Sequence, residues 1–399
     1  MRCLIVVPPF AGHVNPTVAV AAELSARGHR VAWCGPPEVA RLLPPDAELH
    51  PAGVRPADPD SASSPGGFAD LHARWRDRRG VAALRFLVED VLVPLAHAMR
   101  PGVDAAIERV RPHIVISDQQ AFAGGIAAES HGIRWATSAT TSVEFSRPFE
   151  GFPKVHAWVR DRICAVAADA GLGDGWDPRF SPHLVLIFST RQLAGPANGT
   201  DAMPPHHRYV GPAFGTRPVP VDFPWERLAA ERRRVLVSLG TLNREAGTRF
   251  YPAVAEATRP LADRLQVVMA APAGLLGAAD THVLAREFVP QLDLLPHLDA
   301  VVTHGGHNTV CEALAFGLPL VVAPIRDDQP LVAQQVVAAG AGVRVRFGRA
   351  HVPEIRQAIT DVLERAEFRA AAQRVRDSFT AAGGASAAAD ALEELEARA

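Results

Sequence analysis

The sequence carries almost no excess of charge of either sign and very little cysteine. Its 41 lysine and arginine residues stand against 43 aspartate and glutamate residues, which leaves a formal net charge of −2. Proteins that bind nucleic acid through its phosphate backbone usually have a basic excess, so we expect no nucleic-acid partner. The four cysteines lie in apolar stretches without the spacing of metal ligands, which predicts buried, reduced thiols. They are Cys3, Cys34, Cys164 and Cys311.

Long hydrophobic runs are also missing. No stretch of about 18 or more consecutive apolar residues occurs, so we expect no helix that spans a membrane. The first apolar run is short and ends at Pro8-Pro9, without the longer core and cleavage site of a signal peptide, which indicates a first β-strand. A cytoplasmic protein without stable membrane insertion is therefore expected.

What is present is a composition typical of globular proteins, in a chain too long for one core. Hydrophobic residues make up 48% and charged residues 21% of the 399 positions, which argues against disorder or a fibrous repeat. Domains commonly hold about 100–200 residues, so the length favours two domains.

Apolar runs and segments of helical periodicity alternate along the first half. A predicted strand over Leu4–Val7 precedes a predicted helix from about Asn15 to Arg27, in which Pro16 suits the first turn and Gly28 ends the helix. Further strands are predicted over Val31–Cys34, Ile114–Ser117, Trp135–Ala139 and Leu184–Phe188, with a helix over Ala121–Ser130. This alternation is typical of a parallel sheet covered by helices.

The same alternation restarts after a segment rich in proline and glycine. Strands are predicted over Val235–Leu239, Gln266–Met269, Ala300–Thr303 and Leu320–Ala323, and a helical tail follows with an interruption at Gly383-Gly384. We expect an N-terminal domain over 1–212, a linker over 213–232, a second domain over 233–375 and a C-terminal helix over 376–399 that packs back on the first domain. The predicted fold class is α/β.

The most informative stretch covers residues 288–335. A strand ending at Thr303 leads into His304-Gly305-Gly306-His307-Asn308-Thr309 and then a helix, whose first backbone N–H groups favour an anion. The glycines permit close backbone approach, and the polar side chains can donate hydrogen bonds to phosphate oxygens. The pattern is compatible with a diphosphate site, although a plain strand-to-helix turn would have the same form.

The context of this turn is more specific. The stretch resembles the nucleotide-sugar signature of family 1 inverting glycosyltransferases of the GT-B fold, especially the bacterial enzymes that modify polyketides, macrolides and other secondary metabolites. The matching positions are Pro290-Gln291, the residues His304 to Thr309, Glu312, Gly317, Pro319 and Asp328-Gln329-Pro330. The resemblance implies two doubly wound, Rossmann-like domains facing across a cleft, with the acceptor on the first domain and the donor on the second.

By this resemblance, residues of the second domain hold the donor. The segment from Val289 to Gln291 lies against the nucleobase, and His304 contacts the diphosphate. Glu312 accepts a hydrogen bond from a ribose hydroxyl, and Asp328 with Gln329 contacts hydroxyls of the sugar. The loop after the first strand of this domain closes on the diphosphate. The implied donor-binding residues are Ser238, Gly240, Thr241, Val289, Gln291, His304, Gly305, Gly306, Asn308, Thr309, Glu312, Asp328 and Gln329.

The proposed base lies in the first half, in the segment Gly12 to Pro16. A single histidine in a loop is more often structural. The matching Gly-His-x-x-Pro loop of the family, however, carries its general base, which the resemblance places at His13. Asp118 follows the predicted strand Ile114–Ser117 and would reach the same rim of the sheet, although capping of the next helix is an alternative role. A histidine oriented by a carboxylate can take a proton from a hydroxyl group.

The predicted activity is therefore inverting transfer of a sugar or deoxysugar from a dTDP- or UDP-sugar to a hydroxyl of a small lipophilic natural product. The resemblance implies neither a metal ion nor a cofactor besides this co-substrate, and a homodimer is compatible with the sequence. Two alternatives stay open: a nucleotide-sugar epimerase of related fold, and a non-catalytic activator of a partner glycosyltransferase. Acceptor contacts are expected from aromatic residues, for each of which core packing is the alternative: Trp75, Phe86, Phe145, Phe149 and Phe152.

Overall fold

The computed structural model describes residues 1–53, 75, 78, 80–146, 151–195, 203–215, 222–240, 247–276 and 281–398. The contacts within the chain divide it into two compact units. The first unit comprises Met1–Phe188, Ala197–Pro218 and Ala382–Ala399, and the second comprises Ser189–Pro196 and Val219–Ala381. The predicted linker includes residues outside the described ranges, so its bounds stay predictions, as does the facing of the two domains across a cleft.

The first unit is built on a parallel seven-stranded sheet in the order β3-β2-β1-β4-β5-β6-β7. Its strands are β1 (Arg2–Val6), β2 (Arg30–Gly35), β3 (Glu48–Pro51), β4 (Ile114–Asp118), β5 (Trp135–Ala139), β6 (Leu184–Ile187) and β7 (His207–Tyr209). From β1 the chain first builds the sheet toward β3 and then returns to add β4 on the other side. The carboxyl ends of β1 and β4 therefore form the switch point, where ligands bind in such sheets.

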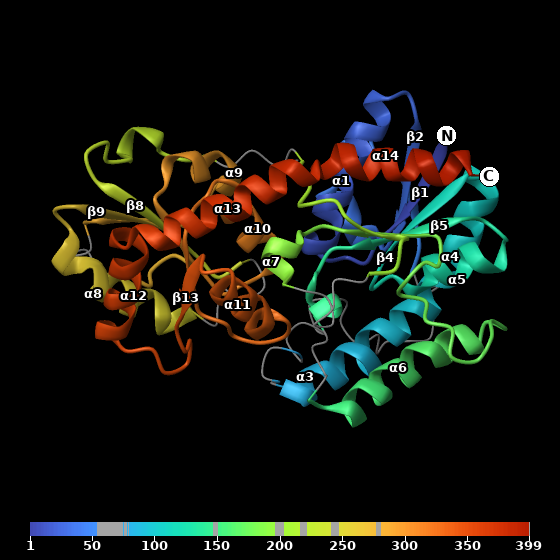
Figure 1. Ribbon diagram of the computed structural model, residues 1–399, viewed down its shortest axis with the longest axis horizontal. Helices are drawn as coiled ribbons and strands as arrows, with labels where there is room; N and C mark the ends of the chain where they lie inside the picture. Colours follow the sequence, from blue (N-terminus) through green and yellow to red (C-terminus); the bar gives the residue numbers. More distant parts are fainter. Residues whose placement is uncertain are drawn as a thin grey trace. The chain divides into compact units, whose positions relative to one another are not determined.

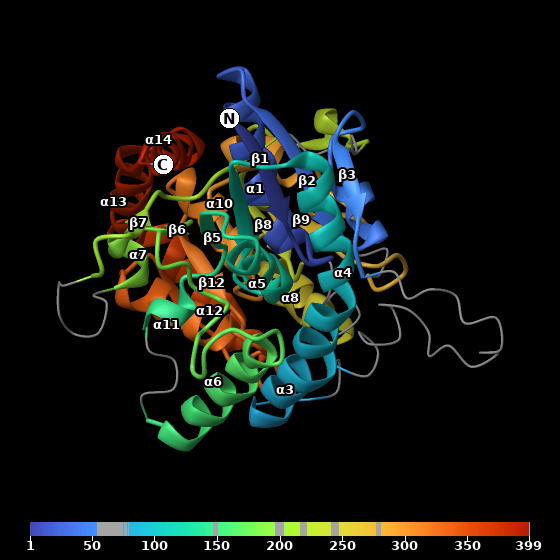
Figure 2. The same cartoon turned by 90° about the vertical axis from the view of Figure 1, so that its right-hand side faces the viewer.

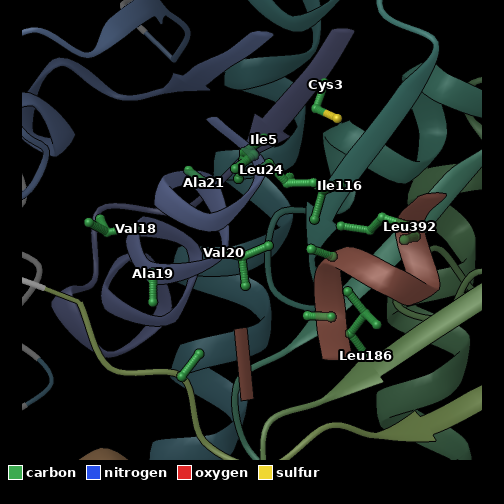
Figure 3. Packing of buried hydrophobic residues seen from close by; sticks show 14 of the residues in the cluster. Cys3, Ile5, Val18, Ala19, Val20, Ala21, Leu24, Ile116, Leu186 and Leu392 are labelled. Carbon is green, nitrogen blue, oxygen red and sulfur yellow. The ribbon is translucent and has the colours of Figure 1, made fainter. Parts of the chain in front are cut away.

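Helices cover both faces of this sheet, which is why its central strands are continuous apolar runs. Helices α1 (Ala11–Ala26) and α14 (Gly384–Ala397) contact each other on one face (Figure 1). Figure 3 shows Leu392 of α14 close to Ile116 of β4 and Leu186 of β6 in this core. Helices α4 (Val93–Val110) and α5 (Phe122–Ser130) cover the other face, and α4 runs beside β1, β2 and β3 (Figure 2).

Further elements belong to the first unit. They are the 3₁₀ turns η1 (Pro37–Leu42) and η3 (Val143–Ser146), α3 (Gly80–Phe86), the π-helical turn η2 (Leu87–Leu92) and α6 (Pro153–Ala168). Buried side chains of α3, η2 and α6 form a separate apolar cluster with Phe10 and Phe122.

The second unit repeats the plan with a six-stranded parallel sheet in the order β10-β9-β8-β11-β12-β13. Its strands are β8 (Arg233–Ser238), β9 (Leu265–Ala270), β10 (Val283–Arg286), β11 (Ala300–Thr303), β12 (Leu320–Val322) and β13 (Gly342–Arg344). Its helices are α7 (Arg191–Ala194), α8 (Phe250–Thr258), α9 (Gln291–Leu294), α10 (His307–Ala315), α11 (Gln329–Ala338), α12 (Val352–Glu364) and α13 (Ala366–Ala382), with 3₁₀ turns η5 (Trp225–Arg227), η7 (Arg259–Leu261) and η8 (Leu295–His297). Helices α8 and α12 pack on one face. The switch point lies between β8 and β11.

The helices at the two ends of the chain differ in part from expectation. Helix α1 begins at Ala11, so His13 lies in its first turn and not in a loop, and Pro16 lies inside the helix and not in its first turn. A proline inside a helix costs one backbone hydrogen bond. Because most of this helix is buried, its packing can offset that cost, and the helix can begin before Pro16. The interruption at Gly383 is present, with a φ of 88°, so the tail from 376 forms parts of two helices.

Two expectations from composition have structural counterparts. All four cysteines are buried and unbridged. Within the described ranges, none of the helices combines the length and the apolar character that crossing a bilayer requires.

Candidate active site

The first polar cluster lies at the switch point of the first sheet. Three elements supply it: His13 comes from the first turn of α1, the helix that follows β1, and Asp118 is the last residue of β4. Thr140 follows the last residue of β5. Because β1, β4 and β5 are parallel neighbours, their carboxyl ends bring these side chains to one rim of the sheet.

These three side chains are joined by hydrogen bonds. Nδ1 of His13 lies 2.8 Å from Oδ1 of Asp118 and 2.8 Å from Oγ1 of Thr140. The Thr140 hydroxyl donates to Oδ2 of Asp118 at 3.1 Å, and the backbone N–H of Gln120 donates to Oδ1 at 2.8 Å. Asp118 is 1% exposed, while the His13 side chain keeps 16% of its surface exposed. The carboxylate is thus buried behind an imidazole that solvent can reach.

The aromatic residues expected at the acceptor have mixed positions. Trp75 and Phe86 are 9% and 1% exposed and belong to the apolar cluster of α3, η2 and α6. Phe145 packs on Phe180, with ring centroids 5.6 Å apart. Phe152 is 64% exposed, and Phe149 lies outside the described residues. Trp75 and Phe86 therefore have core positions, and contact of any of the five with an acceptor stays a prediction.

The second polar cluster lies at the switch point of the second sheet. His304 directly follows β11, and Ser238 ends the neighbouring strand β8. The ring of His304 fills a slot between two glycines. A Cβ atom on Gly240 would lie 2.7 Å from its Cε1, and one on Gly306 would lie 2.6 Å from its Nε2. Gly240 also has a φ of 72°, a conformation that favours glycine. Gly240 and the signature residue Gly306 are thus needed for the position of this ring.

The environment of His304 disfavours its charged form. Burial, together with the positive charge of Arg326, lowers its pKa to about 4, while a hydrogen bond with the backbone of Ser238 opposes the shift. His304 is 8% exposed. At neutral pH in the unliganded protein it is therefore a neutral imidazole, which can donate one hydrogen bond.

Other predicted donor residues lie on α9 and α10 or next to them. Helix α10 begins at His307, so Asn308 and Thr309 lie in its first turn. The amide of Gln291, the first residue of α9, donates to Oε2 of Glu312, which is 3% exposed. This contact joins the residue implied at the nucleobase to the residue implied at the ribose. Val289 is half-buried, and Thr241 lies outside the described residues.

The loop after β12 completes this region. Gln329 uses its side-chain carbonyl oxygen to accept from the backbone N–H groups of Ile325 and Arg326, at 2.9 and 3.0 Å. Its backbone oxygen lies 3.3 Å from the position that a Cβ atom on Gly305 would occupy, so the loop packs closely against Gly305. Gln329 therefore shapes the loop, and its amide nitrogen is the part that can donate to a sugar. Asp328 precedes α11 and is half-buried.

Sequence reasoning missed two residues in these clusters and a third beside the implied nucleobase segment. Thr140 had a usable signal, because it directly follows a predicted strand, as Asp118 does. Arg326 is 4% exposed, with Nε 3.5 Å from Oδ2 of Asp327, and no spacing rule singles it out. Phe288 precedes the implied nucleobase segment and is 55% exposed.

Comparison with known proteins adds to this geometry. Residues 266–395 match the family described as Erythromycin biosynthesis protein CIII-like, C-terminal domain. The whole chain is 30% identical to 4'-demethylrebeccamycin synthase of Lentzea aerocolonigenes, over 99% of both chains. The solved structure of the glycotransferase of kitacinnamycin superposes with a TM-score of 0.75 at 27% identity, covering 99% of this chain and 98% of the other. Glycosyltransferase VinC, solved in complex with dTDP, has the same fold with a TM-score of 0.75 at 22% identity, over the full length of both chains.

The two Rossmann-like sheets, with a polar cluster at each switch point, define a glycosyltransferase of the GT-B fold. The chain belongs to the family 1 natural-product glycosyltransferases of bacteria.

Proposed function

We propose that this glycosyltransferase moves a sugar from a dTDP- or UDP-sugar to a hydroxyl group of a small lipophilic acceptor, with inversion at the anomeric carbon. The observation that carries the proposal is the hydrogen bond of 2.8 Å between Nδ1 of His13 and the buried carboxylate of Asp118 at the first switch point. An imidazole held in this way has its other nitrogen, Nε2, available as a base.

In the proposed step, Nε2 of His13 takes the proton of the acceptor hydroxyl as its oxygen attacks the anomeric carbon. The bond between that carbon and the diphosphate oxygen breaks, and the nucleoside diphosphate leaves with the electron pair. The imidazolium that forms is balanced by Asp118, which stays a carboxylate. Attack on the face opposite the leaving group inverts the configuration.

On the donor side, the diphosphate is proposed to bind at the second switch point. His304 contributes a neutral hydrogen-bond donor, and the first turn of α10 contributes backbone N–H groups. The buried guanidinium of Arg326 adds a fixed positive charge in the same region. Support for a thymidine nucleotide comes from VinC, which has the same fold and was solved with dTDP.

We propose further that this fixed charge replaces a divalent metal ion at the leaving diphosphate. Activity should then survive exhaustive treatment with EDTA. Loss of activity on chelation, with recovery on addition of Mg²⁺, would contradict metal independence and leave the assignment as a glycosyltransferase intact.

A two-stage experiment tests the proposal. Thermal unfolding is first followed with dTDP, UDP and ADP, because a nucleotide that binds the folded state raises the Tm. The dTDP- or UDP-glucose that matches the stabilising nucleotide is then incubated with a panel of phenols and macrolide alcohols, and the products are identified by mass spectrometry. NMR of the anomeric centre of the product distinguishes inversion from retention. Stabilisation by none of these nucleotides, together with no glycosylated product, would overturn the proposal.

The same assay separates the two alternatives. An epimerase would change the nucleotide sugar in the absence of any acceptor, and a non-catalytic activator would consume no donor alone. The relatives reported above are named as biosynthetic and sugar-transferring proteins and lend neither alternative support.

A further inference from the structure

Thr140 contacts both members of the proposed His–Asp pair. Its hydroxyl lies 2.8 Å from Nδ1 of His13 and 3.1 Å from Oδ2 of Asp118. Thr140 is 3% exposed, and Asp118 is 1% exposed, so water does not compete freely for these contacts. The donors and acceptors of the cluster therefore have to satisfy each other.

A count of donors leaves one consistent arrangement. The carboxylate of Asp118 can only accept, and it already accepts from the backbone N–H of Gln120 at Oδ1. If Nδ1 of His13 carried no proton, its lone pair would face Oδ1 at 2.8 Å, a repulsive contact in a buried place. Nδ1 is therefore protonated, and its N–H group donates toward Oδ1 of Asp118 and Oγ1 of Thr140. The Thr140 hydroxyl then uses its own proton for Oδ2.

This arrangement fixes more than a histidine and a carboxylate could fix alone. A single hydrogen bond from Nδ1 to one carboxylate oxygen would still allow the imidazole and the carboxylate to turn about that hydrogen bond. An imidazole that turns away from Oδ1 is no longer required to carry its proton on Nδ1. The Thr140 hydroxyl adds a second contact to Nδ1 of His13 and a contact to the other carboxylate oxygen, Oδ2, so that the three side chains form a closed set of contacts. The Thr140 hydroxyl is fixed in turn, because threonine is β-branched and therefore stiff at χ1, and because Thr140 directly follows the central strand β5.

We infer that Thr140 is a positioning residue for His13, whose hydroxyl holds the ring in the Nδ1–H tautomer and in one rotation, with Nε2 available to the acceptor proton. The inference rests on the proposed role of His13 as base. It adds a third residue to the pair, one that acts through His13 without touching the substrate.

A purely structural role for Thr140 has different consequences. Loss of a buried hydrogen bond would lower stability, but it would leave the tautomer of His13 unchanged. The matched control is Thr137 on β5, which is 0% exposed. Its hydroxyl donates to the carbonyl of Arg179 at 3.0 Å and accepts from the backbone N–H of Ser181 at 2.7 Å, away from His13.

The experiment compares Thr140→Val, Thr140→Ser and Thr137→Val in the full chain. Two-bond ¹H–¹⁵N spectra of histidine-labelled protein report the tautomer directly, with the His13 signals assigned by their absence from His13→Ala. We expect the Nδ1–H tautomer in the wild type, a measurable fraction of Nε2–H tautomer in Thr140→Val, and the wild-type pattern in Thr140→Ser and Thr137→Val. This readout needs no substrate.

Single-turnover transfer is measured with the donor and acceptor pair that the screen above identifies. Thr140→Val should be about 10- to 100-fold slower, as expected when a supporting contact of a catalytic group is lost. Thr140→Ser should recover most of the rate, and Thr137→Val should transfer at nearly the wild-type rate while unfolding at a lower temperature. In a His13→Ala background, Thr140→Val should cause no further loss, because its effect passes through His13.

The outcomes separate this inference from the proposed function. If His13→Ala transfers the sugar slowly and Thr140→Val transfers it at the wild-type rate, the positioning role of Thr140 is wrong, and the assignment of His13 as the base stands. Equal losses of transfer rate in Thr140→Val and Thr137→Val would mean that Thr140 has only a structural role. The wild-type tautomer of His13 in Thr140→Val would mean the same. If His13→Ala transfers at the wild-type rate, the base itself is wrong, and the inference fails with it.

Discussion

The two switch points of this molecule each carry a histidine, and the two histidines have opposite surroundings. His13 keeps part of its ring exposed and is hydrogen-bonded to a buried carboxylate and a hydroxyl. His304 is enclosed between Gly240 and Gly306, with a cation and no carboxylate among the groups that shift its pKa. Both follow a central strand of a similar sheet.

The difference shows that position in the fold selects the place of a functional group, while its neighbours select its chemistry. A carboxylate behind an imidazole stabilises the imidazolium and so favours proton uptake from a substrate. Burial beside a guanidinium disfavours the imidazolium and leaves a neutral hydrogen-bond donor. The same side chain is therefore suited to act as a base in the first unit and as a ligand contact in the second.

The largest effect should come from His13→Ala. Removal of a general base typically slows the chemical step by about 10²- to 10⁴-fold. The implied donor contacts belong to the second unit, so the Kd for dTDP or UDP should hardly change. Single-turnover rates and calorimetric titration measure the two quantities. If His13→Ala lost nucleotide affinity by the same factor as transfer rate, the assignment of the base to His13 and of donor binding to the second unit would be contradicted.

Asp118→Asn should slow transfer by about 10²-fold, because the amide keeps the shape of the carboxylate but cannot balance the imidazolium charge. Asp118 is proposed to act through His13, so the double variant should be little slower than His13→Ala alone. Fully multiplicative losses in the double variant would mean that the two residues act independently.

His304→Ala should have the next largest effect, and on binding. Hydrogen bonds to charged groups contribute about 1.5–3 kcal/mol, so the Kd for the nucleoside diphosphate should rise roughly 10- to 150-fold. The donor in this case is a neutral imidazole and the charge belongs to the phosphate. Titration calorimetry on the folded variant decides: an unchanged Kd would remove His304 from the site.

The central strands could be predicted from the sequence because they are buried on both faces. All nine predicted strands are present, with ends within about two residues of those observed, as is usual for strand ends. Four strands were not predicted from the sequence, and they are the edge strands of the two sheets: β3, β7, β10 and β13. An edge strand has one paired neighbour and is partly exposed, so it lacks the continuous apolar run that identifies a central strand.

The candidate sites were predictable to the extent that a motif or the end of a strand marked them. The resemblance indicated His13, and the end of a predicted strand indicated Asp118; the structure places the two within hydrogen-bond distance. Thr140 and Arg326 were missed, because contacts across neighbouring strands and loops depend on register and loop shape. The slot around His304 could not be predicted either. Two glycines in a sequence, here Gly240 and Gly306, do not show which side chain fills the space beside them.

A smaller effect is expected from Gly306→Ala. Gly306 has a φ of −61°, which alanine adopts freely, so the added methyl group tests the contact with His304 and not backbone strain. Its Cβ would lie 2.6 Å from Nε2 of His304 and must displace the ring. Nucleotide affinity should fall about tenfold, equivalent to about 1.4 kcal/mol. Gly348→Ala is the control, because no atom lies within 4 Å of its Cβ position. Equal affinities of the two variants would argue against the slot.

The smallest effect concerns the pH dependence of stability, and it tests whether His304 is neutral. Burial lowers its pKa from 6.5 to about 4. Below pH 6.5 the unfolded chain takes up a proton at this residue that the folded unit does not bind. The contribution of His304 to the free energy of unfolding is therefore complete above pH 6.5 and decreases as the pH falls toward 4, by at most about 1.4 kcal/mol per pH unit.

His304→Ala removes this titration and leaves the other groups in place. The difference in Tm between wild type and His304→Ala, measured by calorimetry without nucleotide, should hence be smaller at pH 5 than at pH 7. A difference that grows toward pH 5 would mean that the folded protein holds His304 charged. The second switch point would then carry a cationic histidine as the first does during transfer, and the contrast between the two sites would be lost.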